Sequence, residues 1–194
     1  MESGGLQVIT NKEFYHFFRN NLEIENPEIA DYVAGLMVRF ADRQKLSVLF
    51  DERADTEKFD AMWKSQYRSL AYRGFADLGD AYMWLCAFCP SYVSKKRRAS
   101  LGMENYADTG QEAYYNAVTV GNKLKGINPK VRTLYRLGRD FREIVRSIFD
   151  LRRRADISVV LTSPDVLTEM GETFYGGRLA PVYKLKEKPL LIPV

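Results

Sequence analysis

Two cysteines and one histidine are the residues of this sequence best suited to redox or metal chemistry. Cys86 and Cys89 form a C-x-x-C pair, which redox enzymes place at a helix N-terminus, where the helix dipole lowers the thiol pKa. Here the pair falls at the C-terminal end of an apolar segment, where the dipole acts in the opposite direction. A zinc site needs about four ligands, and His16 is the single histidine. We therefore interpret both cysteines as small buried side chains, and we expect no metal and no cofactor.

The shortage of histidine also limits the catalytic mechanisms that the chain could use. A Ser-His-Asp triad, a di-iron Glu-x-x-His pair and an H-E-x-x-H zinc helix are excluded or incomplete when His16 is the only histidine. The sequence contains no G-x-x-x-x-G-K-[ST] loop, so a P-loop nucleotide enzyme is not expected. The composition of the chain therefore favours a protein that is not an enzyme.

Asp80 is the most unusual single residue, because it lies in the otherwise mostly apolar residues 75–85. Burying a carboxylate is costly unless it is paired and hydrogen-bonded. We predict that Asp80 is buried and bonded to an arginine or a tyrosine, with Arg73, Tyr106 and Tyr114 as candidate partners. A ligand-binding or acid–base role is the alternative, because carboxylates with perturbed pKa values cluster at functional sites.

Small and aromatic residues form a pattern around Asp80. The pattern consists of Leu78-Gly79-Asp80, Phe88 and Tyr106-x-x-x-Gly110-x-x-Ala113-Tyr114. It resembles a pattern in a family of bacterial helical proteins that have no assigned function. The resemblance covers residues 70–115, implies a bacterial source and treats Asp80, Tyr106 and Tyr114 as one cluster. It implies no activity, and Cys89-Pro90 is the point at which this sequence departs from it.

Positive charge is concentrated in the second half of the chain. Residues 95–194 contain 19 Lys/Arg and 11 Asp/Glu, whereas residues 1–94 contain 10 and 14. This asymmetry suggests an acidic partner such as nucleic acid, or two halves that attract each other. No recognised DNA- or RNA-binding motif is present, so we favour solvated or partner-facing basic residues over nucleic-acid contacts. The candidate anion or nucleic-acid contacts are Lys95, Lys96, Arg97, Arg98, Arg152, Arg153 and Arg154, and a further stripe contains Arg132, Arg136, Arg139 and Arg146.

Helix-start signals recur along the chain. Thr10 and Glu13 have the spacing of a capping box, and Asn26-Pro27 and Asn128-Pro129 combine an N-cap with a proline at the first helical position. A C-terminal stop is expected at Pro90. The first two predicted helices start at residues 10 and 27. A third helical stretch is predicted from about 56 to 88, with a break near Gly74. Further helices are predicted over residues 103–124, 129–154 and 166–170. Residues 47–50 are predicted as loop or strand and residues 157–161 as a short strand.

Helices with one apolar face must bury those faces against one another. We therefore predict an all-α, multi-helix domain over residues 1–175, with orthogonal or bundle-like packing. Residues 176–194 are predicted to form an extended C-terminal arm, since Pro181, Pro189 and Pro193 oppose a long helix while apolar residues alternate between them. We expect this arm to dock on a helical surface of its own domain or of a neighbouring subunit.

The remaining expectations concern location and function. The longest apolar stretch, residues 81–89, is far shorter than the roughly 20 residues that span a bilayer, and the first ten residues lack signal-peptide features. We expect a cytoplasmic protein without membrane contact. The leading hypothesis is a non-enzymatic interaction or regulatory protein that binds a protein partner or itself, with a dimer formed through residues 178–194. Nucleic-acid binding by the basic second half is the alternative, and a small-ligand or enzymatic site around Asp80 is the third hypothesis.

Overall fold

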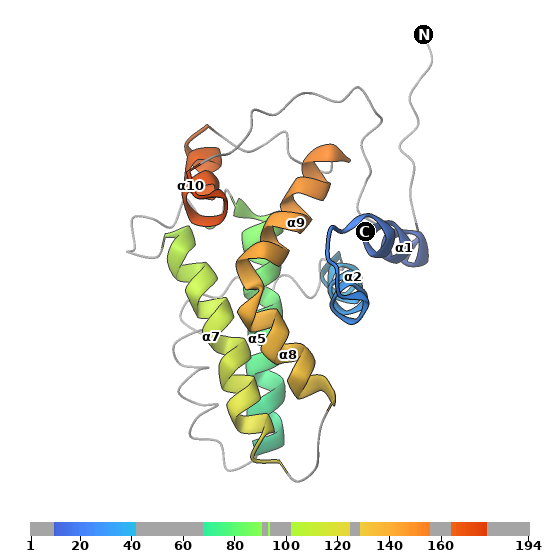
Figure 1. The fold of residues 1–194 in the computed structure, drawn as a ribbon, viewed down its shortest axis with the longest axis vertical. Helices are drawn as coiled ribbons and strands as arrows, with labels where there is room; N and C mark the ends of the chain where they lie inside the picture. Colours follow the sequence, from blue (N-terminus) through green and yellow to red (C-terminus); the bar gives the residue numbers. More distant parts are fainter. Residues whose placement is uncertain are drawn as a thin grey trace.

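The computed structural model describes residues 10–41, 68–90, 93, 102–124, 129–155 and 164–177. Within these ranges the chain forms seven helices and no strand, and the helices pack as a bundle (Figure 1). The prediction of an all-α fold is therefore confirmed. The helices are α1 (Asn11–Asn21), α2 (Pro27–Ala41), α5 (Arg68–Phe88), α7 (Met103–Gly121), α8 (Pro129–Arg139), α9 (Phe141–Arg154) and α10 (Pro164–Tyr175).

The first two helices begin at the predicted capping residues. The Glu13 amide donates to the Thr10 hydroxyl at 3.2 Å, and the Thr10 amide donates to the Glu13 carboxylate at 2.7 Å, which completes a capping box. The Asn26 side-chain oxygen accepts from the amides of Glu28 and Ile29 at 3.0 and 3.3 Å, both in the first turn of α2, which starts at Pro27. These local bonds fix where α1 and α2 start.

Helix α5 is enclosed by the other helices along most of its length. Every residue from Leu78 to Phe88 is buried, so this half of α5 has no solvent-facing side. The helix continues through Gly74 without the predicted break, because the apolar contacts on both sides of Gly74 outweigh the low helix propensity of one glycine. It ends two residues before Pro90, as expected for a residue that cannot donate to the helical ladder.

Close packing of α5 against α7 depends on two glycines. A Cβ atom at Gly79 on α5 would lie 2.8 Å from the ring of Tyr114 on α7, and a Cβ atom at Gly110 on α7 would lie 2.8 Å from Cβ of Tyr82 on α5 and 2.5 Å from the ring of Phe141 on α9. The two helices run side by side in Figure 1. The small residues of the pattern around Asp80 therefore let an aromatic side chain approach each helix backbone.

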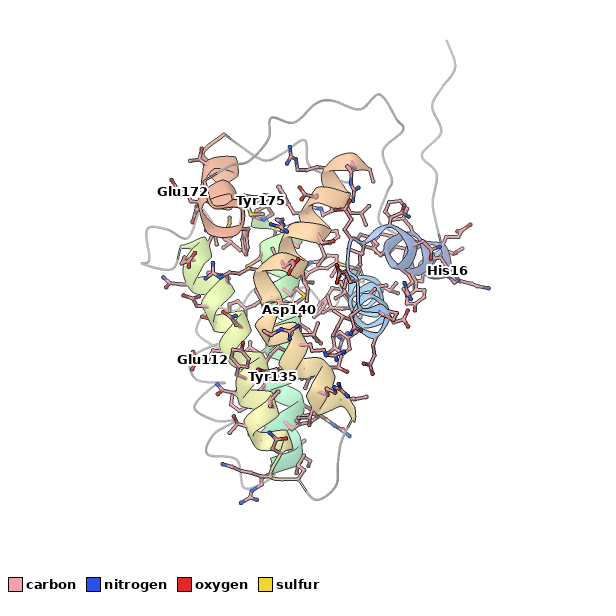
Figure 2. All side chains as sticks on the ribbon, in the orientation of Figure 1. His16, Glu112, Tyr135, Asp140, Glu172 and Tyr175 are labelled. Atoms are coloured by element: carbon pink, nitrogen blue, oxygen red, sulfur yellow. The ribbon has the colours of Figure 1, made fainter. Side chains whose placement is uncertain are left out.

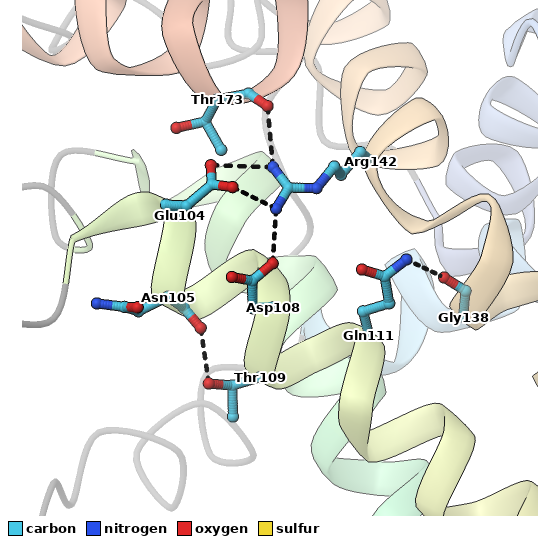
Figure 3. Close-up of polar contacts among 8 residues, drawn as sticks. All are labelled: Glu104, Asn105, Asp108, Thr109, Gln111, Gly138, Arg142 and Thr173. Atoms are coloured by element: carbon cyan, nitrogen blue, oxygen red, sulfur yellow. Dashed lines mark hydrogen bonds and ion pairs between the residues drawn. The ribbon is translucent and has the colours of Figure 1, made fainter.

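The segment predicted as one long helix is divided at Asp140 into α8 and α9. Asp140 has φ −100° and ψ 16°, outside the helical region. The side-chain amide of Gln111 on α7 donates to the Gly138 carbonyl at 2.9 Å (Figure 3). Glycine already disfavours a helix interior, and a tertiary hydrogen bond to its carbonyl supports an irregular turn at this point.

Arg142 joins α7, α9 and α10 near the N-terminal end of α7. Its guanidinium donates to the carboxylates of Glu104 and Asp108, each at 2.6 Å, and to the carbonyl of Thr173 at 3.1 Å (Figure 3). Helix α10, which extends further in both directions than the predicted residues 166–170, is thus tied to α7 and α9. Bidentate arginine–carboxylate pairs are the strongest kind of exposed ion pair.

Several predictions concern residues outside the described ranges. These are the loop or strand at 47–50, the basic run Lys95 to Arg98, the strand at 157–161 and the arm from 178 to 194. Among the helices that the structure describes, none is both long and apolar enough to cross a membrane.

Candidate functional site

Asp80 lies at the centre of a buried polar cluster that joins α2, α5 and α7. Its exposed fraction is 0%. Tyr32 donates to both carboxylate oxygens at 3.0 Å, Tyr114 donates to Oδ1 at 2.7 Å, and Arg39 Nη2 donates to Oδ2 at 2.6 Å. The prediction that Asp80 is buried and bonded to an arginine or a tyrosine is confirmed.

Only one of the three predicted partners bonds to Asp80. Tyr114 does, whereas the places expected for Arg73 and Tyr106 are taken by Arg39 and Tyr32 from α2. Arg73 lies two turns before Asp80, about 10 Å along the helix axis, and its side chain is exposed. The ring of Tyr106 packs against Tyr82, with 5.3 Å between ring centroids.

A sequence signal for the missed partners exists on α2. Tyr32 and Arg39 are seven residues apart, so they lie on the same side of a helix, close to the apolar residues that α2 buries. An arginine beside an apolar helical stripe needs a carboxylate or a carbonyl partner. That signal indicates that the pair faces a polar group, but it does not identify which helix supplies the group.

Burial controls the protonation equilibria of the cluster. It raises the pKa of Asp80, while the nearby Arg39 guanidinium and the hydrogen bonds from Tyr114 and Tyr32 act in the opposite direction. Burial also raises the pKa of both tyrosines, and the charge of Asp80 adds to the effect. Four donated hydrogen bonds occupy the Asp80 oxygens, so a proton acceptor role would require one donor to leave. This arrangement suits a structural connection better than acid–base chemistry.

The cysteines and the histidine lie in different environments, since the cysteines are buried or partly buried and the histidine is exposed. Cys86 is buried, Cys89 is partly buried, and both thiols are free. Burial raises the pKa of each thiol, which lowers the fraction of reactive thiolate. His16 projects outward from α1 (Figure 2). In the described part of the chain, no three His, Cys, Asp or Glu side chains are grouped so that they could hold a metal ion.

The arginines predicted to contact an anion at the end of α9 are engaged within the protein. Arg152 is 2% exposed, so its assignment as a surface contact is wrong: α9 turns this residue towards the C-terminal end of α5. Arg153 lies 3.6 Å from Asp150 and Arg154 lies 2.6 Å from Glu23. These pairs offset the charges of Arg153 and Arg154.

A surface that sequence reasoning missed lies on α7 and α8. The residues Tyr115 and Tyr135 are 36% and 49% exposed, and their ring centroids are 6.1 Å apart. Glu112 lies one turn before Tyr115, and Arg139 lies one turn after Tyr135; Figure 2 labels Glu112 and Tyr135. We call these four residues the α7–α8 face. A signal was present in the sequence, because Tyr114-Tyr115 places adjacent tyrosines on different sides of one helix, and only one of them can face the core.

Comparisons with known proteins give no further guide. A scan against models of protein families, a search of curated proteins and a search of solved structures each found no significant match.

Proposed function

We propose that this chain is a non-enzymatic interaction protein that self-associates, and that the α7–α8 face is its contact surface. The observation that carries this proposal is the exposed pair of tyrosine rings, Tyr115 and Tyr135. Tyrosine and arginine are enriched at the energetic centres of protein interfaces. The cluster around Asp80, in contrast, is closed by its own donors, which argues against an enzymatic site there.

The charges of the α7–α8 face favour a second copy of the chain as the partner. Glu112, one turn before Tyr115, is exposed, and Arg139, one turn after Tyr135, is 58% exposed and pairs with Asp140 at 2.7 Å. In a two-fold symmetric contact, both copies use the same surface. If a residue of one copy contacts a second residue of the other copy, the reverse contact also forms. A face with one acid and one base beside an aromatic centre can therefore be complementary to itself.

Mass in solution tests this proposal. We expect sedimentation velocity to report a dimer for the wild-type chain and a monomer for the double variant Tyr115→Ser with Tyr135→Ser. Leu70→Ser is the matched control, since Leu70 is an exposed apolar residue on α5, and we expect it to remain dimeric. A wild-type monomer at all concentrations would refute self-association.

Deletion of residues 178–194 separates the two candidate interfaces. If the truncated chain becomes monomeric while the double tyrosine variant remains a dimer, the arm and not the α7–α8 face forms the contact. If the truncated chain stays dimeric and the double variant does not, the α7–α8 face is supported.

Nucleic-acid binding is the second candidate function. Arg132 lies one turn before Tyr135 and, in the described ranges, has no carboxylate partner, so a base could stack on the tyrosine ring while the arginine contacts a phosphate. The ion pairs of Arg139, Arg142, Arg153 and Arg154 weaken this candidate. Fluorescence anisotropy with a single-stranded oligonucleotide should show binding that falls steeply with salt and falls in Arg132→Gln; salt-independent binding would refute it.

A bacterial, cytoplasmic setting is part of the proposal. The resemblance over residues 70–115 supports the bacterial source. The free thiols of Cys86 and Cys89 are compatible with a reducing compartment. Fractionation of cells that produce the tagged chain would test the location.

A further inference from the structure

A surface hollow of about 340 Å³ lies between residues 23–29 and the junction of α8 with α9. Ile24, Ile29 and Ile144 supply apolar lining, and the last two are each only 2% exposed. The volume falls within the range of small-molecule sites, which combine an apolar lining with a few placed polar groups. None of the four residues of the Asp80 cluster lines this hollow.

The wall formed by residues 23–29 is held in place by contacts with α9 and α2. The Glu23 amide donates to the Ser147 hydroxyl at 3.0 Å, and Arg154 donates to the Glu23 carboxylate at 2.6 Å. Asn26 caps α2 through its side-chain oxygen. A ligand would therefore meet a wall that is already ordered, which lowers the entropy lost on binding.

The opposite wall is fixed by the α8–α9 junction. Gln111 holds the Gly138 carbonyl at 2.9 Å (Figure 3), and Arg139 makes two hydrogen bonds of 2.7 Å to Asp140. Asp140 itself lines the hollow and is labelled in Figure 2. The irregular turn at Asp140 thus gives the hollow a rigid edge.

The charges that line the hollow are not all balanced by the protein. Four carboxylates and two guanidinium groups line it, and three of the carboxylates are in ion pairs. These pairs are Glu23–Arg154 at 2.6 Å, Asp140–Arg139 at 2.7 Å and Glu143–Arg146 at 4.0 Å. Glu25 and Arg136 remain, and neither has an ion-pair partner in the part of the chain that the structure describes. One unbalanced anion and one unbalanced cation border the same apolar lining.

We propose that this hollow binds a small zwitterion with an apolar body, namely a free amino acid or a dipeptide. Arg136 binds the ligand carboxylate, because a guanidinium offers a planar fork of donors that matches a carboxylate. Glu25 accepts from the ligand ammonium group, and Ile24, the partly exposed isoleucine of the lining, contacts the apolar side chains of the ligand. The proposed ligand contacts, Arg136, Glu25 and Ile24, do not belong to the α7–α8 face, although Arg139 of that face also lines the hollow.

Isothermal titration calorimetry on the full chain tests the site with leucyl-leucine as the probe. We expect saturable binding. Leucyl-leucinamide, which lacks the carboxylate, and N-acetyl-leucyl-leucine, which lacks the ammonium group, should each bind at least about tenfold more weakly, because each loses one charge-assisted contact. Absence of saturable binding by leucyl-leucine overturns the proposal, and so does equal affinity for all three probes.

Two variants with matched controls assign the contacts. Arg136→Gln should weaken leucyl-leucine about tenfold and leave leucyl-leucinamide unchanged, because the amide never used the guanidinium. Glu25→Gln should likewise weaken leucyl-leucine about tenfold and leave N-acetyl-leucyl-leucine unchanged, because that probe has no ammonium group to contact Glu25. The matched controls lie outside the hollow. Arg132→Gln removes a positive charge one turn before Arg136, and Glu28→Gln removes a negative charge three residues after Glu25. Both controls should leave the affinities for all three probes unchanged. Equal weakening in the controls overturns the assignment, and thermal unfolding of each variant checks that it is folded.

Discussion

Asp80 and Arg152 are both buried charges in one helical core, yet they are satisfied in different ways. Asp80 receives hydrogen bonds from three side chains, one of which is the cation Arg39. Arg152 donates to the carbonyl of Ala87 and lies 4.3 Å from the ring centroid of Phe88, while its Nε has no hydrogen-bond partner among the residues that the structure describes. Within the described ranges it makes no ion pair, and burial lowers its pKa to about 10.

The difference separates two uses of a buried charge. Ala87 belongs to the last turn of α5, where carbonyls have no partner within the helix. Arg152 satisfies one of them and places a positive charge at the negative end of the helix dipole. Asp80 instead connects three helices. Loss of Asp80 removes the acceptor of the buried Tyr114 hydroxyl and of the partly buried Tyr32 hydroxyl, and it leaves Arg39 with only Asp77 at 3.5 Å, whereas loss of Arg152 leaves one carbonyl.

The largest expected effect is that of Asp80→Ala. We expect the free energy of unfolding to fall by about 3–5 kcal/mol, because the variant leaves Arg39 without its buried counter-charge and two tyrosine hydroxyls without an acceptor. Urea denaturation followed by circular dichroism measures the change. Asp80→Asn keeps one acceptor oxygen and should lose less. A loss below about 1 kcal/mol for Asp80→Ala would show that the cluster does not stabilise the fold.

A smaller effect is expected at alkaline pH. Burial raises the pKa of Tyr32 and Tyr114 in the folded state, whereas tyrosine in the unfolded chain ionises near pH 10. The folded state then binds more protons than the unfolded state above that pH, so the stability that these hydroxyls contribute is present below about pH 10 and is lost as the pH rises. Each protected tyrosine should add a decline of about 1.4 kcal/mol per pH unit.

Unfolding experiments between about pH 9 and pH 11.5 measure this decline. Tyr114→Phe removes one protected hydroxyl and should make the decline shallower. The contrary result would be an absorbance titration in which the folded wild type ionises one more tyrosine near pH 10 than folded Tyr114→Phe, because Tyr114 would then be unprotected.

The smallest effect is expected for Arg152→Met. The methionine side chain can fill the apolar space beside Phe88 and removes a buried cation without an ion pair, while the Ala87 carbonyl loses its donor. Because these two changes oppose each other, we expect the free energy of unfolding to change by less than about 1 kcal/mol. The same urea experiment compares it with Asp80→Ala. A loss as large as that of Asp80→Ala would remove the distinction between the two regions.

Local signals in the sequence predicted much of the fold. The capping box at Thr10, the Asn26-Pro27 start and the apolar spacing of the helices depend on neighbours within one or two turns. The division at Asp140 could not be predicted in this way, because it involves Gln111, which lies 27 residues before Gly138. The continuity of α5 through Gly74 likewise depends on packing and not on propensity.

The candidate site was predicted only in part, because local signals indicate burial but do not identify partners that are distant in the sequence. The apolar surroundings of Asp80 in the sequence indicated burial, and Tyr114 was one of its three predicted partners. The partners on α2 could not be identified, because nothing local to Tyr32 or Arg39 shows which helix packs against them. The burial of Arg152 was hidden by its neighbours, since three consecutive arginines are typical of an exposed helix end.

The distribution of the Asp80 cluster over three helices affects how cooperatively the chain folds. Tyr114 lies 34 residues from Asp80, whereas Arg39 and Tyr32 lie 41 and 48 residues away, on the other side of it in the chain. A partly folded form in which α5 packs on α7 without α2 would leave Asp80 without its cation and without the Tyr32 hydroxyl, at a cost of several kcal/mol. Such a form is therefore scarcely populated, and one carboxylate couples α2 to the core in a single unfolding transition.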